Sequence, residues 1–68
     1  MFGITQRNEM RDERRIPIVL KAIEQIWLEY PDLRLGQLIQ NVMTIDDYLY
    51  FIEDDVLVER LKQFYGLN

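Results

Sequence analysis

Three stretches of the chain repeat apolar residues every three or four positions, the spacing that puts side chains on one face of an α-helix. The first stripe consists of Ile16, Val19, Leu20, Ile23, Ile26, Trp27 and Tyr30. Pro17 suits the first turn of a helix, because its missing N–H has no partner to lose there. Pro31 ends the helix, because the residue before a proline avoids the helical region. The pattern predicts a helix over residues 16–29.

A narrower stripe predicts a second helix over residues 33–43, and it consists of Leu35, Leu38, Ile39 and Val42. Asp32 precedes this helix and is predicted to cap it by accepting hydrogen bonds from its free N–H groups. The first two helices are therefore joined by a tight corner. Gly36, in the first turn, costs about 0.5–1 kcal/mol against alanine. We expect Trp27 or Tyr30 to pack over it.

Residues 44–53 are polar at their start and apolar at their end, and they exceed the two to eight residues of a typical helix–helix connection. We expect a short turn here, with Tyr50, Phe51 and Ile52 against the core.

The third predicted helix covers residues 54–65. Asp54 and Asp55 complement the positive end of its dipole and can cap its free N–H groups. Gly66 is a suitable C-terminal stop.

These patterns predict an all-α fold, a compact three-helix domain of residues 11–68 with a longer loop before its last helix. Residues 1–10 show no sustained period and are interpreted as a flexible N-terminal arm, with Met10 as a conceivable alternative start.

A chain of 68 residues has a marginal core. With no cysteine or histidine, disulfides are excluded and a zinc site is disfavoured. Tight helix packing or self-association must then supply the stability.

The negative charge is concentrated in the patterned part of the chain. The net charge is −4, and residues 16–68 carry four cationic side chains against nine acids. Binding to DNA phosphates needs a basic face, so we expect no nucleic-acid partner. The gap between the second and third helices is also too long for a helix-turn-helix. The short apolar runs predict neither a membrane span nor a signal peptide, so we expect a cytoplasmic protein.

The polar residues offer little chemistry. Thr5 and Thr44 stand without a visible base, so we predict no catalytic residue and no enzyme. A calcium loop started at Asp46 or Asp47 lacks glycine at its sixth position, which favours helix capping over a cation site. No residue is predicted to bind a metal or a cofactor.

Arg34 allows two interpretations. With Gln37, Gln40 and Asn41 it could form a binding site. Alternatively its guanidinium pairs with Asp54 or Asp55 and ties the starts of two helices together, a fork geometry that gives specificity. We favour the ion pair, and we group Arg34 with the caps and pairs at Asp32, Asp54 and Asp55.

Several apolar residues fall outside the stripes, including Ile18, Leu28, Leu49 and Val56. We take the candidate interaction surface to be Ile18, Leu28, Leu49 and Tyr50. Surplus apolar surface predicts a non-enzymatic protein–protein interaction module with an unidentified protein partner or a homodimer, the commonest closed assembly. The alternative is an acidic, phage-type inhibitor that occupies the basic site of a host nucleic-acid-binding protein.

Two segments of the chain resemble segments of known proteins. They are Pro31-Asp32-Leu33-Arg34-Leu35-Gly36-Gln37-Leu38-Ile39 and Ile52-Glu53-Asp54-Asp55. The chain resembles a group of small bacterial and bacteriophage proteins and is more distantly similar to the YihD-type proteins. The resemblance implies a small all-helical protein, often of phage or prophage origin, and it carries no activity. The Asp47-Tyr48-Leu49-Tyr50-Phe51 segment departs from the Asp-Pro-Phe-Tyr that such proteins often show.

Overall fold

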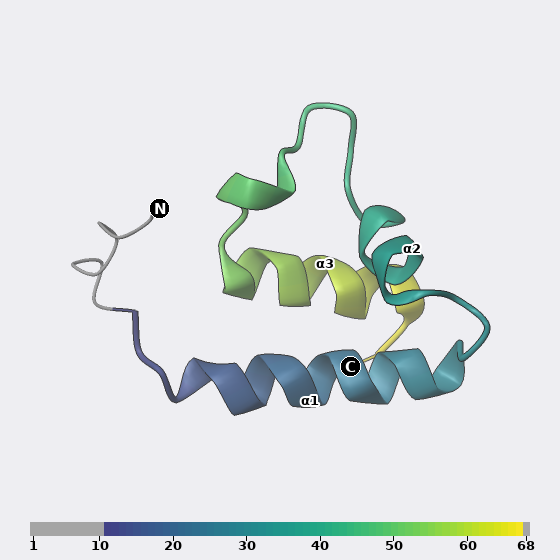
Figure 1. The fold of residues 1–68 in the computed structure, drawn as a ribbon, viewed down its shortest axis with the longest axis horizontal. Coiled ribbons are helices and arrows are strands. Elements are labelled where there is room, and N and C mark those ends of the chain that lie inside the picture. Colours follow the sequence, from purple (N-terminus) through teal and green to yellow (C-terminus); the bar gives the residue numbers. More distant parts are fainter. Residues whose placement is uncertain (1–10, 68) are drawn as a thin grey trace.

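The computed structural model describes residues 11–67, so the predicted arm of residues 1–10 lies outside the described residues. The described chain consists of helix α1 (Arg15–Glu29), helix α2 (Leu35–Gln40), a short 3-10 turn η2 (Leu49–Phe51) and helix α3 (Asp54–Tyr65), with no strand among them (Figure 1). The prediction of an all-α fold with three helices is confirmed.

Helices α1 and α3 lie side by side and run in the same direction (Figure 1). At their starts Arg15 pairs with Asp54, and at their ends the rings of Tyr30 and Tyr65 lie 5.0 Å apart. The segment between these helices must therefore return to the level at which α1 begins. It does so through α2, which lies near the C-terminal ends of both helices, and then through η2.

The predicted bounds of α1 and α3 agree with the structure to within one residue. Pro17 lies in the first turn of α1, and α1 ends at Glu29, two residues before Pro31. Gly66 follows α3 with a φ of 81°, the left-handed conformation that glycine adopts at little cost.

Helix α2 is shorter than predicted, and its start is built differently. Arg34, with φ −76° and ψ 155°, is the last extended residue before it, so Asp32 is not its cap and that prediction was wrong. The side-chain Oε1 of Gln37 accepts a hydrogen bond of 2.8 Å from the Arg34 N–H instead. At the other end, Val42 and Met43 donate to carbonyls only three residues back, which closes the helix early.

Trp27 holds the corner between α1 and α2. Its indole Nε1–H donates to the carbonyl of Leu33 over 2.7 Å, and the N–H of Leu33 donates to the carbonyl of Tyr30 over 3.1 Å. No side chain packs over Gly36, because a Cβ built there meets no atom within 4 Å. The predicted contact of Trp27 or Tyr30 with Gly36 was therefore wrong.

The core is small and is shared by all three helices. Its fully buried side chains are one from each helix, Ile26, Leu38 and Leu61. Val42 belongs to the same cluster, and the half-buried residues packed around it are Ile23, Trp27, Leu33, Leu57, Tyr65 and Leu67. The expectation that Tyr50 and Phe51 join this core was wrong, because both are largely exposed.

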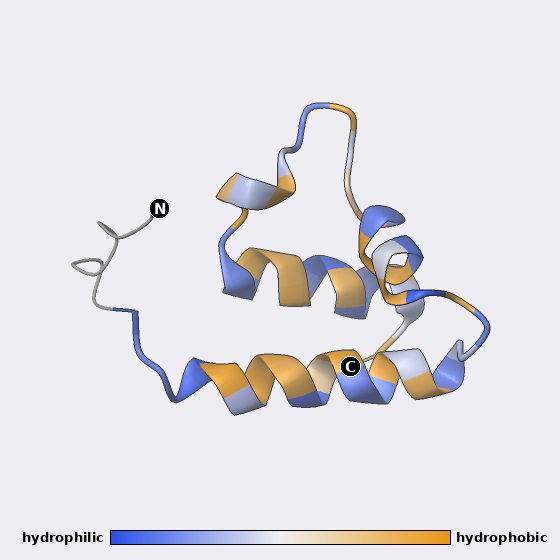
Figure 2. Cartoon of the chain, in the orientation of Figure 1, coloured by the Kyte–Doolittle hydropathy of each residue, from blue (hydrophilic) through white to orange (hydrophobic). Residues whose placement is uncertain are grey.

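Hydrophobic residues are spread along α1, α3 and η2 rather than confined to this core (Figure 2). Within residues 11–67, no helix combines the length and the apolar character that a bilayer span needs.

Replacing a fully buried core residue should cost far more stability than replacing an exposed residue of the same helix. Leu61→Ala is expected to lower the free energy of unfolding by about 2–5 kcal/mol, because it removes buried methyl groups and leaves a cavity. Val56→Ala, at a half-exposed position of α3, should cost less than about 1 kcal/mol. Urea unfolding followed by far-UV circular dichroism at one chain concentration measures both, and equal costs would contradict this description of the core.

Candidate functional site: an apolar groove and an aromatic loop

An open groove of ≈ 520 Å³ lies between α1 and α2. Its apolar walls are formed by Leu20, Ile23, Trp27, Leu28, Pro31, Leu35 and Ile39, and Glu24 is the one charged residue that lines it. The leucines of the groove are exposed by 59% at position 20, 73% at position 28 and 42% at position 35. This concave apolar surface is in contact with water in the single chain. An apolar partner that filled it would remove it from water, which is favourable.

The groove is open because two faces of α1 are apolar and only one is covered. Ala22 and Ile26 are buried, whereas Leu20 and Leu28 lie further round the helix and stay exposed. Helix α2 spans only six residues, which is too short to cover the whole length of α1. The apolar stripe that predicts α1 therefore contains residues of the buried face and residues of the exposed groove wall.

A second apolar surface is the aromatic loop, defined here as residues 45–51, which includes η2. Tyr48 is exposed by 72%, Tyr50 by 82% and Phe51 by 74%. With about 150–250 Å² for each aromatic side chain, the three rings expose roughly 340–570 Å². The largest apolar patch on a typical monomer is about 300–600 Å². The aromatic loop alone reaches that range.

The aromatic loop is held in place by its own contacts. The Phe51 ring lies edge-to-face with Tyr48 at 6.4 Å and with Tyr50 at 4.9 Å. At the start of the loop, the Asp47 carboxylate accepts hydrogen bonds from the N–H of Thr44 over 2.7 Å and from its hydroxyl over 3.0 Å. The same carboxylate forms an ion pair with Arg60 of α3.

The ion pair with Arg60 changes the acidity of Asp47. The guanidinium of Arg60, followed by the backbone N–H of Thr44, lowers the pKa of the Asp47 carboxyl from 3.8 to about 2. Arg60 Nη1 also lies 3.5 Å from the carbonyl oxygen of Val42, at the end of α2. A single side chain of α3 thus fixes both the end of α2 and the start of the aromatic loop.

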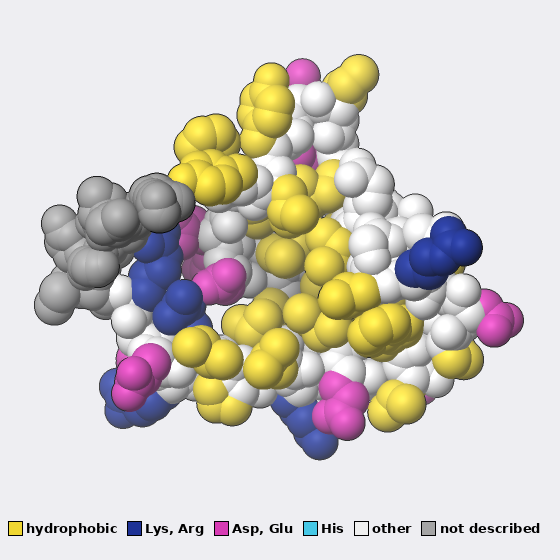
Figure 3. All heavy atoms as spheres, in the orientation of Figure 1, with side chains coloured by type: hydrophobic (Ala, Val, Ile, Leu, Met, Phe, Trp, Pro, Cys, Tyr) yellow, Lys and Arg dark blue, Asp and Glu magenta, His cyan; other side chains and the backbone are white. Residues whose placement is uncertain are grey.

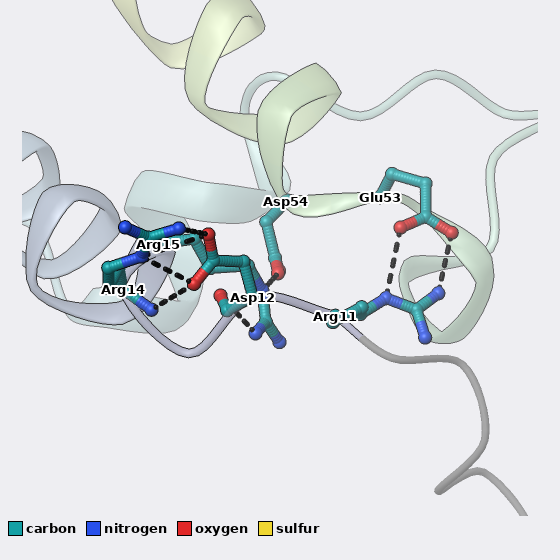
Figure 4. Close-up of polar contacts among 6 residues, drawn as sticks. All are labelled: Arg11, Asp12, Arg14, Arg15, Glu53 and Asp54. Atoms are coloured by element: carbon teal, nitrogen blue, oxygen red, sulfur yellow. Dashed lines mark hydrogen bonds and ion pairs between the residues drawn. The ribbon is translucent and has the colours of Figure 1, made fainter.

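The predicted ion pair of Arg34 was wrong. Within residues 11–67 Arg34 forms no ion pair, and Asp54 pairs with Arg15 of α1 over 2.6 Å (Figure 4). The reason is the parallel packing, which brings the start of α3 to the start of α1, whereas Arg34 follows the C-terminal end of α1. Asp55 has no ion pair in this part of the chain either.

The cluster at the helix starts is broader than a single pair. Arg11 donates two hydrogen bonds to the Glu53 carboxylate, of 2.7 and 3.2 Å, and Arg14 donates to Asp12 (Figure 4). The bond from the Arg14 guanidinium lowers the pKa of Asp12. Glu53, the residue before α3, makes no capping hydrogen bond with its side chain. These acids neutralise arginines at the positive ends of two parallel helices.

Two of the three amides proposed to form a site with Arg34, Gln37 and Asn41, have roles within the fold. Besides Gln37 at the start of α2, Asn41 donates a hydrogen bond of 3.2 Å to the hydroxyl of Tyr65. That hydroxyl donates to the Leu38 carbonyl over 2.8 Å.

The predicted interaction residues are all exposed but do not form one surface. Leu28 lines the apolar groove, whereas Ile18 borders a separate, charged groove between α1 and α3. Leu49 and Tyr50 belong to the aromatic loop. The prediction missed Leu20, Trp27, Leu35 and Ile39 as walls of the groove, because their spacing is that of a core stripe.

Within the described part of the chain, no three acids lie close enough together to hold a metal ion. The acids whose pKa is lowered, Asp12 and Asp47, owe it first to a neighbouring arginine, and neither lines the apolar groove. No known family, curated protein or solved structure matches the chain. The resemblance to YihD-type proteins stays a prediction.

The Asp47–Arg60 pair makes stability depend on pH in the acid range. Between pH 3.8 and about 2 the unfolded chain binds the proton of Asp47 and the folded chain does not. The stabilisation is therefore fully present above about pH 4 and is lost as the pH falls through about 2. A pH titration followed by carboxyl-carbon NMR should give the Asp47 carboxyl a midpoint near pH 2. Arg60→Gln should raise this midpoint, and an unchanged midpoint in that variant would show that Arg60 does not lower the pKa of Asp47.

Proposed function

We propose that the chain is a non-enzymatic protein–protein interaction module that associates with a second copy of itself. The observation that carries this proposal is the excess of apolar side chains at the surface. Among the described residues, thirteen large hydrophobic side chains are exposed, whereas the buried core has five. Eight of the thirteen lie in the groove or the aromatic loop, and exposed apolar residues gathered in this way are typical of an interaction surface.

The energetics favour a surface larger than the groove alone. Burying a leucine completely contributes about 1.5–3 kcal/mol, so the exposed parts of Leu20 and Leu28 offer roughly 1–2 kcal/mol each. Association costs about 4–15 kcal/mol in lost freedom of motion. A stable complex therefore has to bury the groove together with further apolar surface of the same molecule.

The alternative is an acidic inhibitor of a basic, nucleic-acid-binding protein, and the charge of −5 on residues 16–68 supports it. It has less support than self-association for two reasons. Three of the nine acids in this part of the chain, Asp47, Glu53 and Asp54, are already paired with arginines. The apolar groove also has a single charged residue in its lining.

A charge placed in the groove should prevent self-association without unfolding the chain. Leu28→Glu puts a carboxylate on a wall that is largely exposed in the monomer, so the fold is retained while docking requires burial of an unpaired charge. Gln25→Glu is the matched control, because it adds the same charge at an exposed position of α1 outside the groove lining.

Sedimentation velocity from micromolar to millimolar concentration provides the measurement. The wild type and Gln25→Glu should change from the monomer mass of 8.3 kDa to a dimer, while Leu28→Glu stays monomeric. A wild type that remains monomeric throughout would refute self-association. A salt-sensitive complex with a basic protein, formed equally by Leu28→Glu, would favour the alternative instead.

A further inference from the structure

We infer that the apolar groove of one copy receives the aromatic loop of a second copy, in a reciprocal two-fold dimer. The inference rests on the proposed self-association and states which surfaces meet. It distinguishes this arrangement from the simpler one, in which two grooves face each other.

The two surfaces are complementary in shape and chemistry. The groove is concave and its walls are aliphatic except for Trp27, Pro31 and Glu24. The aromatic loop projects beyond the helices and carries three exposed rings (Figure 1). Two grooves that face each other would enclose a space and leave their apolar walls in contact with water. A loop placed in each groove removes both the groove walls and the loop's rings from water.

The aromatic loop suits an anchor because its conformation is set before docking. The edge-to-face contacts of Phe51 and the ties from Asp47 to Thr44 and Arg60 already order the loop in the single chain. Little conformational entropy then remains to be lost when it docks. Tyrosine is also one of the residue types that dominate the energy of protein interfaces.

One view of the molecule shows apolar side chains over α1, across the middle of the face, and at the edge formed by η2 and the loop before it (Figure 3). The two places that matter for docking are the space beside α1 and that edge. If a two-fold axis lies in the plane of this face, midway between the two places, it brings a second copy face to face with the first. Each of the two places of one copy then lies opposite the other place of its partner. The loop of one copy then lies over the groove of its partner, and the reverse contact forms at the same time.

One pair of opposite charges favours this arrangement locally, although both copies are acidic overall. Arg34 precedes Leu35 of the groove, and Asp46 lies in the aromatic loop. Neither residue forms an ion pair within residues 11–67. Docking of loop into groove therefore brings a region with a spare cation toward one with a spare carboxylate.

The area also favours two contacts over one. The rings of one loop expose roughly 340–570 Å², so the two loops of a reciprocal dimer supply roughly 680–1,140 Å² before the groove walls that they cover are added. Stable interfaces bury about 1,200–2,000 Å² in total. A single contact has half of that loop area, so two reciprocal contacts come much nearer to the range, and a closed dimer is expected rather than an open chain of molecules.

The test compares a chain that lacks the loop anchor with a chain whose groove is blocked. Tyr50→Ala/Phe51→Ala removes exposed rings and keeps the groove, whereas Leu28→Glu blocks the groove and keeps the loop. Each variant alone should be monomeric where the wild type is dimeric, with dimer affinity reduced roughly tenfold or more.

Because the chain has no native cysteine, disulfide trapping between two single-cysteine variants can detect even a single weak contact. A mixture of Tyr50→Cys and Leu28→Cys chains under mild oxidation should give a covalent heterodimer in preference to either homodimer. A mixture of Tyr50→Cys and Ile18→Cys is the control, because Ile18 is exposed but lies outside the apolar groove.

The outcomes separate the two proposals. A wild type that dimerises while Tyr50→Ala/Phe51→Ala dimerises equally well, or trapping that yields mainly Leu28→Cys homodimers, overturns the inference and leaves self-association standing. A wild type that stays monomeric overturns self-association itself. Loss of dimer in both variants, with heterodimer trapped at positions 50 and 28 and none at 50 and 18, supports the reciprocal arrangement.

Discussion

The contact of Ile26, Leu38 and Leu61 holds the molecule together, because it is the place where all three helices meet. Each helix contributes one fully buried side chain, and the other apolar contacts surround these three. Burial at this point requires the corner after α1, which Trp27 closes by donating to the Leu33 carbonyl. It also requires the return of the chain through residues 41–53, which lets α3 lie parallel to α1.

Parallel packing of two helices has an electrostatic cost that the charged residues offset. The positive ends of α1 and α3 lie together, and α1 begins at Arg15 with no acid in its first turn. Asp54 from α3 supplies a carboxylate at that point, and Glu53 supplies another to Arg11. Glu53 and Asp54 thus pair with arginines at the start of α1 rather than cap α3 with their side chains.

A core of this size leaves much of the apolar surface uncovered, and the folding pattern determines where. Because α2 ends after six residues, one wall of α1 stays open as a groove. Because Asp47 is tied to Arg60 and Thr44, the following aromatic residues project from the fold instead of packing into it. The groove and the aromatic loop are thus two results of the same constraint, a chain too short to cover its own hydrophobic faces.

The sequence predicted the parts of the fold that depend on local signals. The apolar period with Pro17 and Pro31 defines α1, and the acids with Gly66 define α3. The signals at α2 were misleading, because Asp32 has the chemistry of a cap while the turn places Arg34 at that position. Ion-pair partners depend on the direction in which helices pack, and no local pattern distinguishes Arg15 from Arg34 as the partner of Asp54. Nor does a period distinguish a buried stripe from the wall of a groove, so the stripe that predicts α1 does not show that Leu20 and Trp27 line a groove.

The most direct test of the central claim uses the chain's single tryptophan, Trp27, which lines the groove. Acrylamide quenching of its fluorescence reports how far water-borne molecules reach this wall. If the groove is filled by a second copy, the quenching constant should fall as the chain concentration rises through the range in which the sedimenting mass doubles. A quenching constant that stays the same while the mass doubles would show that the copies meet elsewhere and would contradict the account.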